Sequence, residues 1–234
     1  MTPEERPKLK IQLSPTDKVF ELLGWGALLA LWVWTGTSYS SLPDTIPTHF
    51  NAAGEADGFG GKDSIFLGPG ILGVVSLFTF FLVTNIKNID PKRVKEEDDG
   101  MMKKFALLTV LFSSILSLII IKSAASPLMN VSKLILPAIG LFFAVIGWAM
   151  PKIGQNYFAG FKLPWTLENV DNWNETHKVA GKLWLYGGFF QVITSLVFSD
   201  MLALVCFMVT TLVMFIVHTI FSYRMFKRCN TIES

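Results

Sequence analysis

The chain has 234 residues, of which 51% are hydrophobic, 13% aromatic and only 16% charged, and its formal net charge is +2. The hydrophobic residues lie in continuous blocks and do not alternate with polar ones, which excludes a transmembrane β-barrel and favours helices in a lipid bilayer. A net charge this small says little about partners, and no direct nucleic-acid partner is predicted.

Six apolar stretches are long enough to cross a bilayer. Each has about 17 to 23 residues, or about 25 to 35 Å of α-helix, against a hydrocarbon core of about 30 Å. They cover residues 19–40, 65–86, 105–125, 134–150, 183–199 and 201–223. The fourth stretch is short and contains Pro137, so its alternative is a helix buried in protein. The first follows basic residues, as a secretory signal does, but its length and the lack of a cleavage site predict a retained helix.

Basic residues fall on one side of these stretches. Of the 20 Lys and Arg residues, all but Lys62, Lys122 and Lys133 lie before the first stretch, after the last, or in the second and fourth connections. Because Lys and Arg near span ends favour the cytoplasm, both termini are predicted to be inside. The predicted fold class is therefore an all-α, polytopic integral membrane protein with six transmembrane helices and cytoplasmic termini.

This topology divides the chain into five parts. They are an N-terminal cytoplasmic tail (1–18), a two-helix domain (19–86) with a structured extracellular loop (41–64), a charged cytoplasmic loop (87–104), a four-helix domain (105–223) with a cytoplasmic loop (151–182), and a C-terminal cytoplasmic tail (224–234). The lipid bilayer is the first predicted partner.

The outer loop 41–64 is rich in Gly and Pro, which predicts consecutive turns and a compact loop. Its polar residues His49, Asn51, Glu55 and Asp57 are candidate contacts for a ligand such as a peptide or a lipid headgroup. The alternative is that they satisfy turn amides. Their spacing matches neither an EF-hand nor a zinc site, so no metal and no cofactor is predicted.

The inner loop 151–182 mixes aromatic and basic residues, which is typical of a segment that lies at the bilayer surface. Thr166 is a candidate helix cap, and residues 172–177 are predicted to form an entry turn before the next span. Glu175 and His177 suggest acid–base chemistry, but residues two apart point to different helix faces and no Ser or Cys nucleophile accompanies them. No catalytic residue is assigned, and an interfacial or partner-binding role is preferred.

Polar groups inside the spans are few. Gln191 and His218 are the intramembrane candidates, and a lone His at this depth is more often hydrogen-bonded between helices than a proton carrier. Gln191 is either its partner or bonds elsewhere. Without a carboxylate pair or matched broken helices, an ion-coupled transporter is disfavoured.

Two motifs resemble a known family. The outer PDTIPTHFNAAGEADGFGGK resembles the domain of unknown function that precedes the SdpI domain, and the inner NYFAGFKLPWTLENVDNWNETHKVAGKLW resembles the SdpI signature. The inner segment supplies the predicted partner or interface residues Asn156, Tyr157, Phe158, Gly160, Pro164, Trp165, Thr166, Trp173, Thr176, His177 and Gly181. Lys162 and Leu163 stand where the family usually has a basic residue and Thr. The resemblance covers residues 18–223 and makes the four-helix domain SdpI-like.

The resemblance implies a multi-pass protein of the bacterial inner membrane that confers immunity to a secreted membrane-active peptide. It also implies a signalling receptor that recruits a cytoplasmic transcriptional repressor. The outer loop would then meet the toxin peptide and the inner loop the repressor. The alternatives are a small permease or lipid-handling transporter, which needs a polar cavity, and an enzyme that uses His177 as acid or base.

Overall fold

The computed structural model describes residues 15–89, 96–126 and 129–232. Most of the predicted N-terminal tail, the middle of the charged loop 87–104 and the last two residues lie outside these ranges. The elements are α1 (Pro15–Ser38), η2 (Tyr39–Ser41), β1 (Thr45–Phe50), β2 (Ala56–Gly61), η3 (Lys62–Phe66), α2 (Leu67–Ile89), α3 (Glu96–Ala125), α4 (Ser132–Ala149), η4 (Met150–Lys152), α5 (Pro164–Glu168), α6 (Val170–Val197) and α7 (Asp200–Ile232).

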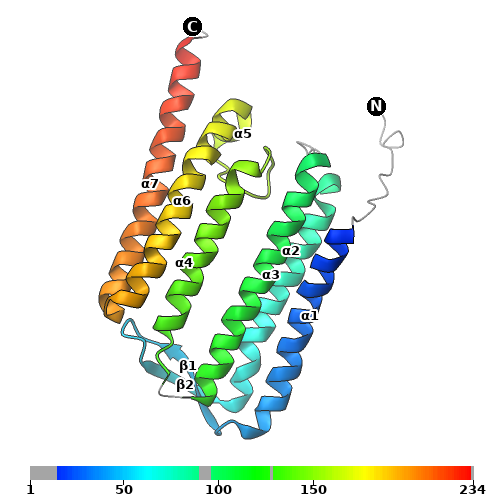
Figure 1. Ribbon diagram of the computed structural model, residues 1–234, viewed down its shortest axis with the longest axis vertical. Helices are drawn as coiled ribbons and strands as arrows, with labels where there is room; N and C mark the ends of the chain where they lie inside the picture. The colour runs from blue at the N-terminus through cyan, green and yellow to red at the C-terminus, as the bar shows by residue number, and fades with distance from the viewer. Residues whose placement is uncertain (1–14, 90–95, 127–128, 233–234) are drawn as a thin grey trace.

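Six long helices run side by side along the long axis of the molecule (Figure 1). The β-hairpin lies at one end, and α5 lies at the other, where α1 begins and α7 ends. Contacts are densest between α4 and α6 and between α6 and α7, while α3 packs mainly on α1 and α2. The packing therefore divides the helices into two groups, α1 to α3 and α4 to α7. In the first group α3 packs on both α1 and α2.

Four helices are long and apolar enough to cross a membrane among the residues that the structure describes. They span Lys62–Leu82, Lys103–Ala125, Ser132–Lys152 and Asp200–Arg228. The short fourth stretch with Pro137 is among them, and so are three other predicted spans. Helices α1 and α6 lie beside these four in the bundle and are not among the spans found within the described residues. The count of six spans and the cytoplasmic termini remain predictions.

Helices α4 and α6 touch backbone to backbone. A Cβ built on Gly147 would lie 2.2 Å from the backbone N of Leu185, and one built on Gly188 would lie 2.4 Å from the backbone N of Ala144. Helix association in lipid depends on packing more than on the hydrophobic effect, so small residues at such contacts allow the backbones to approach closely. Glycines on both helices thus set the centre of the C-terminal group.

The outer loop contains regular structure that its turn-rich sequence did not predict. β1 and β2 pair antiparallel, with Ile46 opposite Gly60 and irregular register beyond Pro47. The strand β2 was not predicted because it is rich in Gly, which has low β-propensity. At two of these positions, however, the neighbouring side chains leave no room for a Cβ. A Cβ on Gly58 would lie 2.8 Å from the Cβ of His49, and one on Gly60 would lie 2.7 Å from the Oγ of Ser64. The all-α class describes the bundle, and the hairpin is an addition to it.

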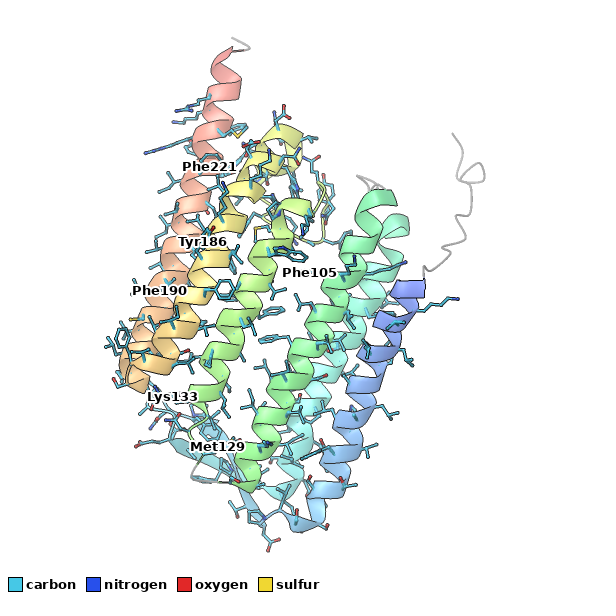
Figure 2. All side chains as sticks on the ribbon, in the orientation of Figure 1. Phe105, Met129, Lys133, Tyr186, Phe190 and Phe221 are labelled. Atoms are coloured by element: carbon cyan, nitrogen blue, oxygen red, sulfur yellow. The ribbon has the colours of Figure 1, made fainter. Side chains whose placement is uncertain are left out.

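Lys133 fastens the start of α4 to the turn between α6 and α7 at the hairpin end of the bundle (Figure 2). Its ammonium donates to the carbonyl of Ser195 at 3.1 Å and to that of Phe198, and it lies 3.8 Å from the carboxylate of Asp200. Asn130 donates to the same carboxylate at 2.7 Å. A cation at the C-terminal end of α6 satisfies carbonyls that the helix itself leaves unpaired.

Replacing Lys133 with Met is expected to destabilise the protein by about 1 to 3 kcal/mol, because hydrogen bonds that involve a charged group are lost and partly buried carbonyls stay unpaired. Thermal unfolding in detergent measures the loss. The matched control is Lys62→Met, since Lys62 pairs with the exposed Asp44 at 3.5 Å and lies 5.2 Å from the centre of the Tyr39 ring. This variant should change stability by about 1 kcal/mol or less. Equal effects of the two variants would contradict the assigned role.

Candidate functional site

The four predicted ligand contacts of the outer loop bind one another. His49 Nδ1 lies 2.6 Å from the carboxylate of Asp57. Asn51 accepts from the backbone N–H of Ala53 at 2.9 Å and of Glu55 at 3.1 Å, and its amide donates to the Glu55 carboxylate at 3.2 Å. These contacts close the hairpin turn, so the side chains serve first to shape the loop.

A pocket of about 420 Å³ lies beneath the hairpin. It is bounded by β1, the start of α2, the end of α3 and the start of α4, and its lining is mainly apolar, with Ile46, Ile65, Ile120 and Ile135 among its walls. Its size and its apolar character with few polar groups are typical of ligand pockets. The hairpin end of the bundle therefore has a candidate binding pocket, whose apolar walls the predicted polar contacts did not include.

On the opposite end, Asn156 organises the loop that follows η4. Its side-chain oxygen accepts from the backbone N–H of Phe158 at 2.8 Å and of Ala159 at 2.7 Å, while its amide donates to the carbonyls of Gly154 and Ala159. The side chain is 1% exposed. Every hydrogen-bonding direction of this amide is used, so Asn156 holds the loop's shape and presents nothing to a partner.

His177 anchors the same loop to α6. Its Nδ1 donates to the carbonyl of Trp173 at 2.7 Å, and its Nε2 accepts from the backbone N–H of Phe161 at 3.1 Å. The ring stacks on Trp173 with 4.0 Å between centroids, and the Trp173 indole donates to the carbonyl of Ile153 at 2.9 Å. Gly160 has φ +109°, and a Cβ there would lie 2.4 Å from His177 Nε2. A side chain other than hydrogen at residue 160 would therefore displace the loop.

A second set of hydrogen bonds ties α5 and α6 to α7. The Trp165 indole donates to the hydroxyl of Ser222 at 2.7 Å, and that hydroxyl donates to the side chain of Asn172 at 3.1 Å. Thr176 donates to the same Asn172 oxygen at 2.9 Å, and the Asn172 amide donates to the Ser222 carbonyl at 3.1 Å. Trp165 also packs its ring on Tyr223 of α7. Trp165 is thus a clamp between helices as well as an aromatic residue near the surface.

The structure corrects two predictions for the inner loop and agrees with a third, that Thr166 caps a short helix. Helix α6 begins at Val170, so the segment 172–177 is not an entry turn but part of a continuous helix. Thr166 caps α5 from within the helix, where it accepts from the backbone N–H of Leu163 at 2.9 Å. Trp173 is 0% exposed and faces protein, so it does not anchor the loop to lipid.

Exposure divides the family motif into two parts. The buried members are Asn156, Thr166, Trp173, Thr176, His177 and Gly181, whereas Tyr157, Gly160 and Pro164 are exposed and Phe158 and Trp165 are half-buried. The buried part fixes the loop on the bundle. Direct contact with a cytoplasmic partner would therefore fall to the exposed part and to neighbours such as Lys162.

His177 is held neutral by its surroundings. Its pKa is lowered from 6.5 to about 4, mainly by burial and to a smaller extent by the nearby His218. The hydrogen bond to the Trp173 carbonyl acts in the opposite direction. Both ring nitrogens already have backbone partners. His177 therefore has no free nitrogen with which to act as an acid or base, and the enzyme hypothesis loses its candidate residue.

The buried neutral imidazole predicts that the protein loses stability on acidification. The pKa of His177 is about 4 in the folded protein and 6.5 when unfolded, so the unfolded chain binds the proton more readily. The stabilisation is complete above pH 6.5 and is lost between pH 6.5 and pH 4, by about 3 kcal/mol in total. Thermal unfolding between pH 7.5 and pH 4.5 measures it, and His177→Asn should flatten the profile. An unchanged profile in that variant would exclude His177 as the cause.

The intramembrane candidates do not meet. Gln191 donates to the Thr211 hydroxyl at 2.8 Å and to the Phe207 carbonyl at 3.2 Å. His218 donates from Nδ1 to the Met214 carbonyl at 2.6 Å within its own helix, so the expected bond to another helix is absent from its described contacts. The Oε1 of Gln191 and the Nε2 of His218 are buried without a partner among the described residues. Neither residue lines a pocket that the structure describes between the helices.

Together the bundle, the outer hairpin and the fixed inner loop define a helical membrane protein that presents a folded element at each end. Residues 152–222 match the SdpI/YfhL protein family, and residues 26–73 match the domain of unknown function DUF1648. The C-terminal part of the chain is therefore similar to the SdpI/YfhL family, and the region before it is similar to DUF1648. The resemblance predicted from the two motifs is confirmed.

Individual relatives agree with this assignment. The immunity protein SdpI of Bacillus subtilis is 25% identical over 198 residues, which are 82% of this chain and 88% of the relative. An uncharacterized protein of Archaeoglobus fulgidus is 37% identical over 62 residues, which are 26% of this chain and 34% of the relative. The chain thus spans about a third of the archaeal relative's length. No solved structure matches the chain.

Several residues that hold the site together were not found from the sequence. Ser222 and Phe161 make central contacts, but a Ser in an apolar helix and a Phe in an aromatic loop carry no distinguishing pattern. Lys133 was noticed only as one of three outer cations, because the carbonyls that it contacts at the end of α6 lie more than 60 residues away in the sequence.

Proposed function

We propose that this protein confers resistance to a secreted, membrane-active peptide that it meets at its outer face. The observation that carries the proposal is the similarity to an immunity protein over 82% of this chain and 88% of that relative. The apolar pocket beneath the hairpin supports it, because a membrane-active peptide must expose apolar side chains.

The transporter alternative has no comparable support. It requires a wetted polar cavity between helices, and the two pockets described along α4, α6 and α7 are mainly apolar, although Lys182, Tyr186 and Thr210 line one of them. Gln191 and Thr211, which would line such a path, bond to each other.

The proposal includes a second, inner role. The loop between α4 and α6 is fixed on the bundle by Asn156 and His177 while Tyr157, Lys162 and Pro164 stay exposed. A rigid surface of this kind suits recruitment of a cytoplasmic repressor when peptide is bound outside. Lys162→Glu should abolish recruitment in a membrane co-sedimentation assay and leave resistance unchanged, whereas a joint loss of both would contradict separate outer and inner roles.

Resistance is tested by producing the chain in a sensitive bacterial host and exposing the cells to a panel of membrane-active peptides. For at least one peptide, the inhibitory concentration should be about tenfold higher than for cells with empty vector. A change of this size corresponds to removal of most free peptide from the membrane. Cells that produce Gly147→Leu at the same level serve as control, because that change separates α4 from α6. An unchanged response to every peptide would overturn the proposed function.

A further inference from the structure

The outer pocket lies along one edge of β1. Its lining includes every residue from 46 to 51 in succession and no residue of β2. A pocket over one face of the hairpin would meet alternate residues of both strands, because successive side chains point to opposite faces. A run of consecutive residues from one strand instead indicates the edge that faces away from β2.

That edge carries unpaired backbone groups. β1 pairs with β2 on its other side, and in the described part of the chain no backbone hydrogen bond joins it to a third segment. Pro47 lacks an N–H, which is typical of edge strands and shortens the stretch that another strand can join. The remaining groups on this edge are a template for an extended chain.

The charge around the edge selects the partner. Asp44, whose side chain is 96% exposed, precedes β1, and the exposed Glu55 lies in the turn beyond it. In the whole outer segment 41–64 there are four acidic residues and one Lys. A strand that lies along β1 therefore places both its ends beside carboxylates, which favours a peptide with basic residues at its ends.

We propose that β1 binds an extended, cationic, amphipathic peptide segment as a third strand, with an apolar side chain of the peptide in the pocket and basic residues near Asp44 and Glu55. The proposal deepens the proposed function and rests on it for the peptide's role. Backbone pairing would give affinity with little dependence on sequence, and the pocket with its acidic rim would give selectivity.

The experiment uses the full chain in nanodiscs with a photo-crosslinker, p-benzoylphenylalanine, in place of Thr48, which is exposed on β1 and lines the pocket. The probe is a biotinylated peptide of alternating Leu and Thr with Lys at both ends. Capture should exceed by about tenfold that of a matched protein with the crosslinker in place of Phe59. Phe59 is 61% exposed on β2 and does not line the pocket, so it also tests whether the free edge of β2 binds the peptide equally well.

Two altered probes separate the contributions. A peptide with alternate N-methylated amides keeps the side chains but cannot pair as a strand, so its capture should fall by about fivefold or more. Capture of a peptide with Glu in place of Lys should fall as well, because it loses its attraction to the carboxylates. Equal capture of the N-methylated peptide would overturn strand addition and indicate an apolar pocket that an acyl chain fills as readily.

A pocket-filling variant supplies the last arm. Ile135→Trp fills the pocket from α4 and should reduce capture at residue 48, while the neighbouring Leu134→Trp, whose residue does not line the pocket, should not. Unfolding temperatures confirm that both variants are folded. The proposal is contradicted if the Ile135→Trp and Leu134→Trp variants capture the peptide equally. It is also contradicted if crosslinkers at residues 48 and 59 capture the peptide equally, and in either case protection of cells does not rescue it. A clean capture result without protection in any cell assay would instead contradict the proposed function.

Discussion

Gly147→Ala is expected to destabilise the protein by about 3 kcal/mol or more, although alanine is the better helix former. The added Cβ would lie 2.2 Å from the backbone N of Leu185 and 2.7 Å from the carbonyl of Gly181. Both are backbone atoms of α6 and have no rotamer by which to move away. The two helices must separate along their contact, which loosens the packing that holds the C-terminal group.

Thermal and denaturant unfolding in detergent measure this loss, and crosslinking between cysteines placed on α4 and α6 reports the separation. The matched control is Gly36→Ala in α1, because a Cβ there meets nothing within 4 Å. That variant should be neutral or more stable by up to about 1 kcal/mol, as helix propensity dictates. If both variants behave alike, the close approach of α4 and α6 is wrong.

Gly160→Ala is expected to release the inner loop at a cost of about 3 kcal/mol. Gly160 has φ +109°, which costs an alanine about 1 to 2 kcal/mol. The new Cβ would also lie 2.4 Å from His177 Nε2 and so displace the N–H of Phe161 from that nitrogen. An unpaired buried acceptor adds about 1 to 3 kcal/mol.

The release has a local signature besides the loss of stability. Because His177 would regain access to solvent, the acid-dependent part of its stabilisation should shrink, and a cysteine placed at residue 158 should react faster with a polar thiol reagent. Gly61→Ala is the control, since Gly61 has φ −62° and open space around its Cβ position. Unchanged thiol reactivity in Gly160→Ala would show that the loop tolerates the side chain.

Structural features that depend only on contiguous residues were predicted correctly. Long apolar runs must form helices in lipid because every backbone group needs an internal partner there, and four of the six predicted spans meet the length and hydropathy of a crossing. The two motifs at residues 43–62 and 156–184 were sufficient to identify the family. Both are local sequence features, so no knowledge of packing was needed.

Features that depend on pairing between distant segments were not predicted. The strand β2 exists because Gly58 and Gly60 let His49 and Ser64 come close, a reason invisible in a glycine-rich sequence. Similarly, the outer polar residues were predicted either to contact a ligand or to satisfy turn amides, and only the structure shows that His49 bonds to Asp57 and Asn51 to Glu55. A side chain's free capacity is known only when its neighbours in space are known.

The sequence by itself determined the class of protein, its apolar helices and its resemblance to the SdpI family, because length, hydropathy and ordered motifs are properties of contiguous residues. The tertiary structure alone decided that the buried half of the SdpI motif is an internal scaffold and that an apolar pocket lies along β1. Both follow from which segments meet. Asn156 and His177 form their hydrogen bonds within the loop and its anchor on α6, and residues of β1, η3, α2, α3 and α4 line the pocket.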